Sequence, residues 1–191
     1  MKFLGKCQHQ TVKKCEMNEL LILVDENDNE TGSMNKLDAH QSGLLHRAFS
    51  VFIFNQKGEI LLQQRADGKY HSAGLWSNTC CSHPLKGERV NDAVSRRLKE
   101  EMGIECATQF QFRFIYKVAL ENGLTEHELD HVYFGKSDAV PVPDPNEVKD
   151  WQYVRPEKLK EEIISHPQEY SAWLKICFPK VESIILQKSD F

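Results

Sequence analysis

The stretch that most strongly decides the fold is SHPLKGERVNDAVSRRLKEEMGI, residues 82–104. Apolar residues recur at every fourth position from Val90 to Met102, so the spacing predicts a helix over Glu88–Met102 with one apolar face. Gly103 follows directly and is suited to end this helix. A helix of this kind covers the core of a layered domain with its apolar side.

Strands are predicted on both sides of this helix along the chain. Short apolar or alternating runs indicate them at Glu19–Asp25, Phe49–Phe54, Glu59–Gln64, Phe110–Val118, Glu126–Phe134 and Val148–Val154. The turn residues 55–58 favour a β-hairpin between the second and third of these strands. In the fourth, alternation would place Phe110, Phe112 and Phe114 on one side.

Two helices are predicted near the end of the chain, over Arg155–Ser165 and Tyr170–Phe178, and Pro179 is expected to break the second. Strands of mixed order with a central helix and C-terminal helices indicate an α/β layered domain. We expect a single domain over residues 19–191, preceded by an N-terminal extension over residues 1–18.

The composition excludes several classes of protein. The 191 residues are 40% hydrophobic and 27% charged, which is typical of a folded chain and not of a disordered one. The formal charge of -4 argues against nucleic-acid binding, and no apolar run approaches the roughly 20 residues that span a bilayer. The start MKFLGKCQHQ lacks the apolar segment of a secretory signal, and six cysteines without a C-x2-C pair favour free thiols. We therefore expect a cytoplasmic protein that binds neither nucleic acid nor a membrane.

The polar face of the predicted helix carries opposite charges at i,i+4 spacing, in the pairs Arg96 with Glu100 and Arg97 with Glu101. Alone, these pairs are typical of a solvated helix surface. The whole string nevertheless resembles the Nudix box, G-x5-E-x7-R-E-U-x-E-E-x-G-U with U aliphatic, whose carboxylates hold divalent cations against a diphosphate. Ser82 replaces the first glycine, and Arg97 replaces a glutamate that Nudix hydrolases use at the metal centre. The resemblance therefore implies a Nudix scaffold that has lost part of the hydrolytic site.

The loop before this helix, SNTCCSHP over residues 77–84, brings thiols and an imidazole together among small polar residues. Such a loop suits a metal site, a thiol nucleophile or a protonation site. In extended backbone, Cys80 and Cys81 point to opposite sides, so at most one of them faces a given pocket.

Two glutamates, Glu126 and Glu128, are spaced to share one face of a strand, with Cα atoms roughly 6 to 7 Å apart. Carboxylates placed in this way repel each other unless a cation or a shared proton lies between them. A polar strand face is an equally good explanation for the pair alone. Together with His40, His46 and His83, however, they form a set of nitrogen and oxygen donors that suits Zn2+, Mn2+ or Mg2+.

Taken in order, these motifs resemble the type 1 isopentenyl-diphosphate isomerase family. The match runs from Lys36 to Trp173, and we identify the chain as a member of this family on the following residues: Lys36-x3-His40, LHRAFS at 45–50, QRA at 64–66, WSNTCCSHP at 76–84, the altered Nudix box and Glu126-x-Glu128. One small departure is Ser77, where the family usually has threonine. The resemblance implies an α/β (α+β) fold of the Nudix type, in which a mixed β-sheet is sandwiched between helices.

The resemblance also implies an activity, the interconversion of isopentenyl diphosphate and dimethylallyl diphosphate in isoprenoid biosynthesis. The family protonates and deprotonates its substrate through a tertiary carbocation, with a thiol and a carboxyl group on opposite faces. Carried over, these groups are Cys81 and Glu128, with Tyr116 hydrogen-bonded to the carboxyl group and Trp173 facing the cation. Without the family, Trp173 would be interpreted as a core residue of a C-terminal helix.

The binding residues implied by the resemblance form three groups. One divalent ion, Zn2+, Mn2+ or Mg2+, would be held by His40, His46, His83, Glu126 and Glu128. A second ion, Mg2+, would be held by Glu101 and would bridge to the diphosphate. The diphosphate itself would contact Lys36, Arg65, Lys69 and Arg97. The expected partners are therefore small isoprenoid diphosphates, and the expected state is a monomer or a weak dimer.

Two other functions stay open on the sequence. A Nudix hydrolase acting on a nucleotide or prenyl diphosphate would need to replace the missing box carboxylate from elsewhere. A metal-binding or nucleotide-sensing module would have no turnover. Neither alternative explains the thiol Cys81, the paired glutamates and the three histidines together.

Overall fold

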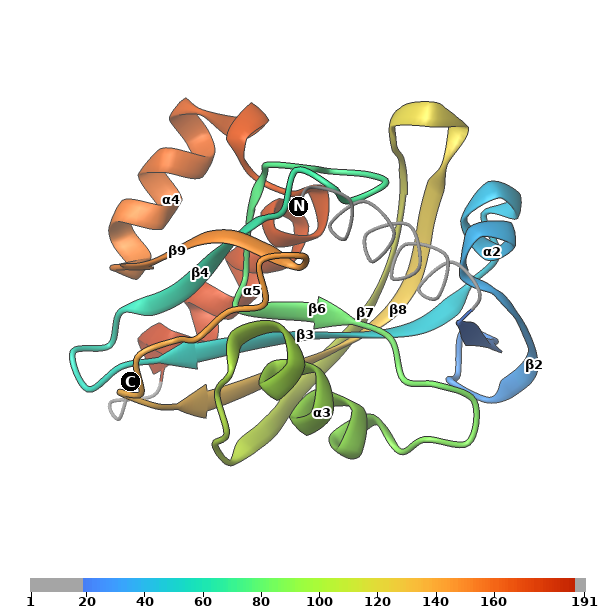
Figure 1. Cartoon of the computed structure of the whole chain (residues 1–191), viewed down its shortest axis with the longest axis horizontal. Helices are drawn as coiled ribbons and strands as arrows, with labels where there is room; N and C mark the ends of the chain where they lie inside the picture. Colours follow the sequence, from blue (N-terminus) through green and yellow to red (C-terminus); the bar gives the residue numbers. More distant parts are fainter. Residues whose placement is uncertain (1–18, 188–191) are drawn as a thin grey trace, which may run out of the picture.

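Strand β3 (His46–Phe54) is the centre of a mixed nine-stranded sheet in the computed structural model, which describes residues 19–187 (Figure 1). Strand β8 (Thr125–Lys136) pairs in parallel with every residue of β3. The short β6 (Cys80–Ser82) pairs with β3 in antiparallel orientation. The paired glutamates of β8 lie beside the first residues of β3, and β6 pairs with β3 a few residues further along. This arrangement positions the site described below.

The other strands extend the sheet. Strand β4 pairs with β5 and β9, β7 pairs with β8, and β1 pairs with β2 and contacts β3 at one residue. Their bounds are Leu20–Val24 for β1, Glu30–Asn35 for β2, Ile60–Arg65 for β4, Trp76–Ser77 for β5, Thr108–Ala119 for β7 and Val148–Val154 for β9. Strands β1, β3, β4, β7, β8 and β9 lie close to the six predicted ones.

The predicted β-hairpin between β3 and β4 is wrong beyond its turn. The two strands pair only at Phe54 and Ile60, where residues 55–58 connect them. The edges of β3 are occupied instead by β6 and β8, and β4 pairs with β9. The turn residues determine the connection, but strands from distant parts of the chain take the hydrogen-bonding positions.

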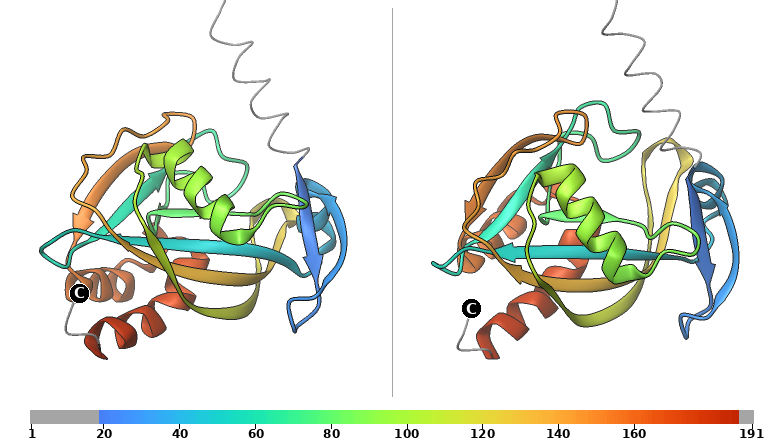
Figure 2. Two further views of the ribbon diagram at one scale, coloured as in Figure 1. Left: turned by 90° about the horizontal axis from the view of Figure 1, so that it is seen from below. Right: turned by 60° about the horizontal axis from the view of Figure 1, so that its bottom comes forward.

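Side chains that alternate along β3 build two separate cores. Phe49, Val51 and Ile53 pack on one face against the helix α3 (Val90–Met102), whereas Phe52 and Phe54 pack on the opposite face. That second face is covered by α5 (Ala172–Gln187), with α4 (Pro156–Ser165) beside it. Figure 2 shows α3 and α5 on opposite sides of the strands. The predicted sheet between helices, with helices at the C-terminal end, is thereby confirmed.

Helix α5 continues through Pro179, so the predicted break at this residue is wrong. A proline within a helix removes one backbone hydrogen bond and costs about 3 kcal/mol or more. Phe178 and Val181, on either side of the proline, are both buried in the same core. Their burial stabilises the helix on both sides of Pro179.

The three phenylalanines of β7 do not share one side. A β-bulge between Phe110 and Phe112 shifts the register, so that Phe110 pairs with Tyr133 and is half-exposed. Phe112 and Phe114 remain on the α5 side and contact each other. One extra residue in a strand moves every preceding side chain to the opposite face, which simple alternation does not anticipate.

Helix α2 (Lys36–Ser42) and strand β2 were not predicted, because the segment after β1 has the composition of a turn. Two 3-10 turns complete the described structure, η1 (Glu121–Gly123) and η2 (Pro167–Glu169). No helix within residues 19–187 has the length and apolar character needed to cross a membrane. The predicted N-terminal extension, residues 1–18, lies outside the described residues, and the domain boundary stays a prediction.

Candidate active site

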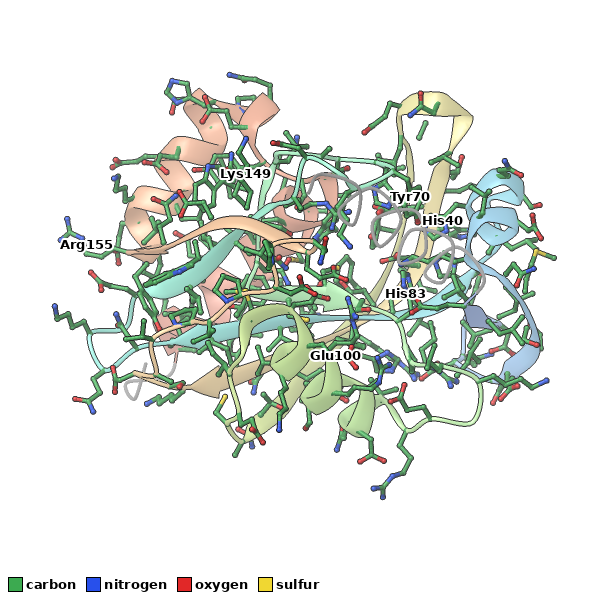
Figure 3. All side chains as sticks on the ribbon, viewed as in Figure 1. His40, Tyr70, His83, Glu100, Lys149 and Arg155 are labelled. Atoms are coloured by element: carbon green, nitrogen blue, oxygen red, sulfur yellow. The ribbon has the colours of Figure 1, made fainter. Side chains whose placement is uncertain are left out.

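A pocket lies where α2, α3 and α5 approach β4, β6 and β8. All four of the predicted diphosphate-binding cations line it: Lys36, Arg65, Lys69 and Arg97. Tyr70, His40 and His83 lie together beside α2 (Figure 3), with ring centroids 5.9 to 6.0 Å from His40. The unpredicted helix α2 is therefore what carries Lys36 and His40 to the site.

Two of the predicted metal-binding histidines are held by backbone carbonyl groups. The Nδ1 atoms of His40 and His46 lie 2.7 and 2.8 Å from the carbonyl oxygens of Lys36 and Leu44, so each Nδ1–H donates to a carbonyl. Each Nε2 atom then carries a lone pair and no hydrogen. Among the described residues, neither of these buried Nε2 atoms has a hydrogen-bond partner. Burial lowers the pKa of His40 to about 4, which keeps its ring neutral. Neutral imidazoles fixed in this way are typical metal ligands.

Glu128 lies against these histidines, since β8 places it opposite His46. Its Oε1 is 3.0 Å from Nε2 of His83 and 3.5 Å from Nε2 of His46. Nε2 of His46 carries a lone pair and no hydrogen, and it faces Oε1 of Glu128, which is also an acceptor. Such a contact needs a cation or a proton between the two atoms. The ligand atoms of His40, His46, His83 and Glu128 all lie within 4.8 Å of one another. These four buried side chains therefore fit a divalent ion.

The two glutamates of β8 hold different charges. Burial and the nearby charge of Glu128 raise the pKa of Glu126 well above its usual value. For Glu128, burial acts in the same direction, but the hydrogen bond with Nε2 of His83 acts against it, and the pKa of Glu128 lies well below the usual value. Tyr116 donates a hydrogen bond of 2.6 Å to Oε2 of Glu128. Burial and the hydrogen-bond partners therefore act on the two neighbouring carboxyl groups in opposite directions.

His71 belongs to the site, although the sequence analysis did not select it. It forms a second possible metal group with His40 and Glu126, and its Nε2 lies 3.7 Å from Oε1 of Glu126. Its ring contacts those of His40 and Trp173. The one signal in the sequence was its position in the same loop as Lys69, two residues after that predicted cation.

Adjacent cysteines take opposite faces of β6. Cys80 is buried in the core beneath α3, whereas Cys81 lines the pocket. Burial, followed by the charge of Glu128, raises the pKa of the Cys81 thiol well above its usual value, so the thiol is protonated at neutral pH. Ser50 lies opposite Cys81, with its Oγ 3.7 Å from Sγ, and donates a 2.8 Å hydrogen bond to Asp130.

Trp173, at the start of α5, closes one wall of the pocket. Its Nε1–H donates to Oγ of Ser77 at 2.8 Å, which fixes the indole plane. The guanidinium group of Arg65 lies over the ring, 5.2 Å from its centroid. The indole is therefore part of the pocket and of the α5 core at the same time.

The part of the pocket lined by Lys69 and Arg97 also contains a glutamate that was not predicted from the sequence. Glu147, the residue directly before β9, forms ion pairs with Lys69 and with Arg97. Arg97 also donates to Oε1 of Glu101 at 2.8 Å, and Gln63 donates to the other oxygen of Glu101. No pattern in the sequence distinguished Glu147, because its partners come from distant segments.

Comparison with known proteins shows the family to which the chain belongs. Residues 44–174 match the NUDIX domain family. The chain is 52% identical over 165 residues to the isopentenyl-diphosphate Delta-isomerase 1 of Aromatoleum aromaticum, covering 86% of this chain and 93% of that protein. It is 50% identical over 161 residues to the isopentenyl-diphosphate Delta-isomerase of Pectobacterium atrosepticum, covering 84% and 90%.

Solved structures show the same fold at low sequence identity. A protein from Deinococcus radiodurans matches with a TM-score of 0.72 at 20% identity, covering 85% of this chain and 98% of that one. A MutT protein from Methanosarcina mazei matches with a TM-score of 0.62 at 19% identity, covering 73% and 94%. With half of its residues identical to curated isomerases and a NUDIX domain over most of its length, the chain belongs to the isopentenyl-diphosphate Delta-isomerases of the NUDIX domain family.

Proposed function

We propose that the chain interconverts isopentenyl diphosphate and dimethylallyl diphosphate by moving a proton on each side of a carbon–carbon double bond. The observation that carries the proposal is one pocket lined by both the thiol of Cys81, whose pKa is raised, and the carboxyl group of Glu128, whose pKa is lowered. An unactivated alkene is a weak base, so isomerisation needs a positioned acid and a positioned base at the same substrate.

The two groups suit complementary roles. In one direction the Cys81 thiol donates its proton to the terminal CH2 carbon, and a tertiary carbocation forms. Glu128 then accepts a proton from the carbon next to the CH2O group, so that the double bond moves by one position. In the reverse direction the roles of the two groups are exchanged. The proton gained by the substrate and the proton lost from it balance, and no other reagent is consumed.

Neighbouring residues support this chemistry. The hydrogen bond from Tyr116 holds the Glu128 carboxylate in one orientation. The indole of Trp173 offers its π face to the carbocation, an interaction worth roughly 2 kcal/mol when it is desolvated. Water would quench the cation, and the burial of Glu128 and Trp173 helps to exclude it.

Two divalent ions belong to the proposal. His40, His46, His83, Glu126 and Glu128 would hold one of them, and this donor set suits Zn2+, Mn2+ or Mg2+. Glu101 would hold Mg2+ at the diphosphate, with the carbonyl of Cys81. When bound, these ions supply positive charge that neutralises the buried carboxylates and the diphosphate. The substrate diphosphate would contact Lys36, Arg65, Lys69 and Arg97, which line the same pocket.

Chemistry also favours a location. A protonated, unmodified Cys81 needs a reducing compartment, and Cys80, Cys81, Cys106 and Cys177 are all free thiols in the described part of the chain. We therefore place the activity in the cytoplasm, on small isoprenoid diphosphates, with a monomer or a weak dimer as the working state.

Proton exchange in D2O tests the proposal. Isopentenyl diphosphate is incubated with the protein and Mg2+ and followed by NMR, for wild type, Cys81→Ala and Cys80→Ala. We expect dimethylallyl diphosphate and deuterium in the substrate pool with wild type and Cys80→Ala, and neither with Cys81→Ala. Phosphate release without deuterium incorporation would indicate a hydrolase, and no reaction at all would indicate a binding module.

A further inference from the structure

Glu147 lines the pocket, and the proposed reaction assigns it no role. Its main chain is held on both sides, because its N–H donates to the carbonyl of Asp144 at 2.9 Å and its carbonyl accepts from the N–H of Ala66 at 3.0 Å. Its side chain is only 9% exposed. The carboxylate is therefore fixed inside the pocket and is not free to turn into solvent.

This carboxylate bridges two of the cations proposed to bind the diphosphate. It forms an ion pair with Lys69, from the segment after β4, and its Oε1 lies 3.1 Å from Nη2 of Arg97, on α3. The same Nη2 atom lies 2.8 Å from Oε1 of Glu101. The buried carboxylates of Glu101 and Glu147 thus compensate the two partly buried cations, and this side of the pocket has little net positive charge to offer an anion.

We propose that Glu147 makes diphosphate binding depend on a divalent cation. The inference rests on the proposed function, in which Lys69 and Arg97 contact the diphosphate. A metal-free diphosphate has to compete with a fixed carboxylate for both cations, and it is repelled by Glu147 and Glu101. A diphosphate bound to Mg2+ brings positive charge that offsets these carboxylates. Glu147 is therefore a specificity-determining residue, which selects the magnesium complex over the free anion.

Binding of inorganic pyrophosphate, measured by calorimetry on the full chain, tests this inference. One preparation of each protein is titrated in buffer with Mg2+ and in buffer freed of Mg2+. For wild type we expect clearly tighter binding with Mg2+. For Glu147→Gln we expect the metal-free Kd to fall by about tenfold, since a fixed negative charge near the anion has been removed. The Kd with Mg2+ should change less, so the preference for the magnesium complex shrinks.

Glu100→Gln is the matched control. Oε2 of Glu100 lies 2.8 Å from Nη1 of the same Arg97, but its side chain is 45% exposed and does not line the pocket. This control should keep the wild-type preference for Mg2+. A residue that only positions Lys69 and Arg97 would behave differently, because Glu147→Gln would then weaken both forms equally and leave the preference unchanged.

Three results would overturn the inference. These are a Glu147→Gln preference equal to that of wild type, a Glu100→Gln preference that shrinks as much, or a wild type that binds pyrophosphate equally well in both buffers. The last result needs no variant, so the test stands even if Glu147→Gln fails to fold. Isomerase turnover of the wild type, measured separately in D2O, shows whether the proposed function holds when this inference fails.

Discussion

The two halves of strand β8 bury opposite kinds of side chain on one face. Toward its end, Val132 and Phe134 pack in the apolar core beneath α5. Toward its start, Glu126, Glu128 and Asp130 occupy the same face and are just as buried. Alternation gives both halves the same geometry, so the difference comes from what surrounds them.

Buried carboxyl groups are costly unless hydrogen bonds or charges compensate them. Around Glu128 the compensation comes from the hydroxyl group of Tyr116 and the imidazole of His83, which reach it from two other segments. Asp130 is compensated only in part: its Oδ2 accepts from Ser50, and burial raises its pKa to about 8. The apolar half of β8 therefore stabilises the fold, whereas in the proposed function the carboxyl half carries the catalytic base and the metal ligands.

The largest expected effect is that of Glu128→Gln at the carboxyl half. The amide has nearly the same shape but is not a base, so we expect turnover to fall by more than about a thousandfold. Circular dichroism should show an unchanged fold. Turnover is measured by NMR in D2O. Wild-type turnover in Glu128→Gln would show that the catalytic base is elsewhere.

Phe134→Ala should reverse this pattern at the apolar half. Phe134 is 2% exposed and contacts the rings of Phe52 and Phe54. Removing a buried aromatic side chain costs about 3 to 5 kcal/mol. We expect the free energy of unfolding in urea to fall by this amount, while the turnover of the folded protein stays near that of wild type. A large loss of turnover without a loss of stability would contradict the separation of the two halves.

Local patterns predicted much of this arrangement. Helix α3 followed from apolar residues at four-residue spacing, and the shared face of Glu126 and Glu128 followed from strand alternation. Both depend only on neighbours along the chain. The bulge before Phe112 and the uninterrupted helix at Pro179 depend instead on contacts with distant segments, and for this reason the sequence predicted them wrongly.

The site shows the same limit. Lys69 and Arg97 were selected because they match positions of a known family, and the structure brings them into one pocket. His71 and Glu147 lie in that pocket too, but each stands alone in its segment. A single histidine or glutamate in a sequence usually has a structural or surface role. Only the tertiary contacts of His71 with Glu126 and of Glu147 with Arg97 distinguish these two residues.

Acid should weaken the contribution that the buried histidines beside β8 make to stability. In metal-free protein, burial lowers the pKa of His40 to about 4 and that of His83 to about 3, against 6.5 in an exposed ring. At His40 the unfolded chain therefore binds a proton that the folded chain does not, and the stability that this imidazole contributes above pH 6.5 is lost as the pH falls toward 4. Glu126 and Asp130, whose pKa values are raised in the folded chain, act in the opposite direction, so the His40 contribution has to be isolated with a variant. For His40 alone the loss is on the order of 3 kcal/mol.

Urea unfolding of the metal-free protein at a series of pH values measures this loss. His40→Gln should reduce the slope of stability against pH, whereas Phe134→Ala should lower stability at every pH and keep the wild-type slope. Equal slopes in wild type and His40→Gln would show that the buried imidazole of His40 does not contribute.

The smallest expected effects come from removing one tyrosine hydroxyl group, either on β7 at the proposed active site or on β8 at the face that packs against α3. The Tyr116 hydroxyl donates to Glu128 at 2.6 Å, whereas the Tyr133 hydroxyl donates to Asn91 at 2.7 Å on the α3 side. Each Tyr→Phe change should cost about 1 kcal/mol of stability. Only Tyr116→Phe should also slow turnover, by about tenfold, because Glu128 loses the group that orients it. Equal turnover in both variants would mean that this hydrogen bond serves only the fold.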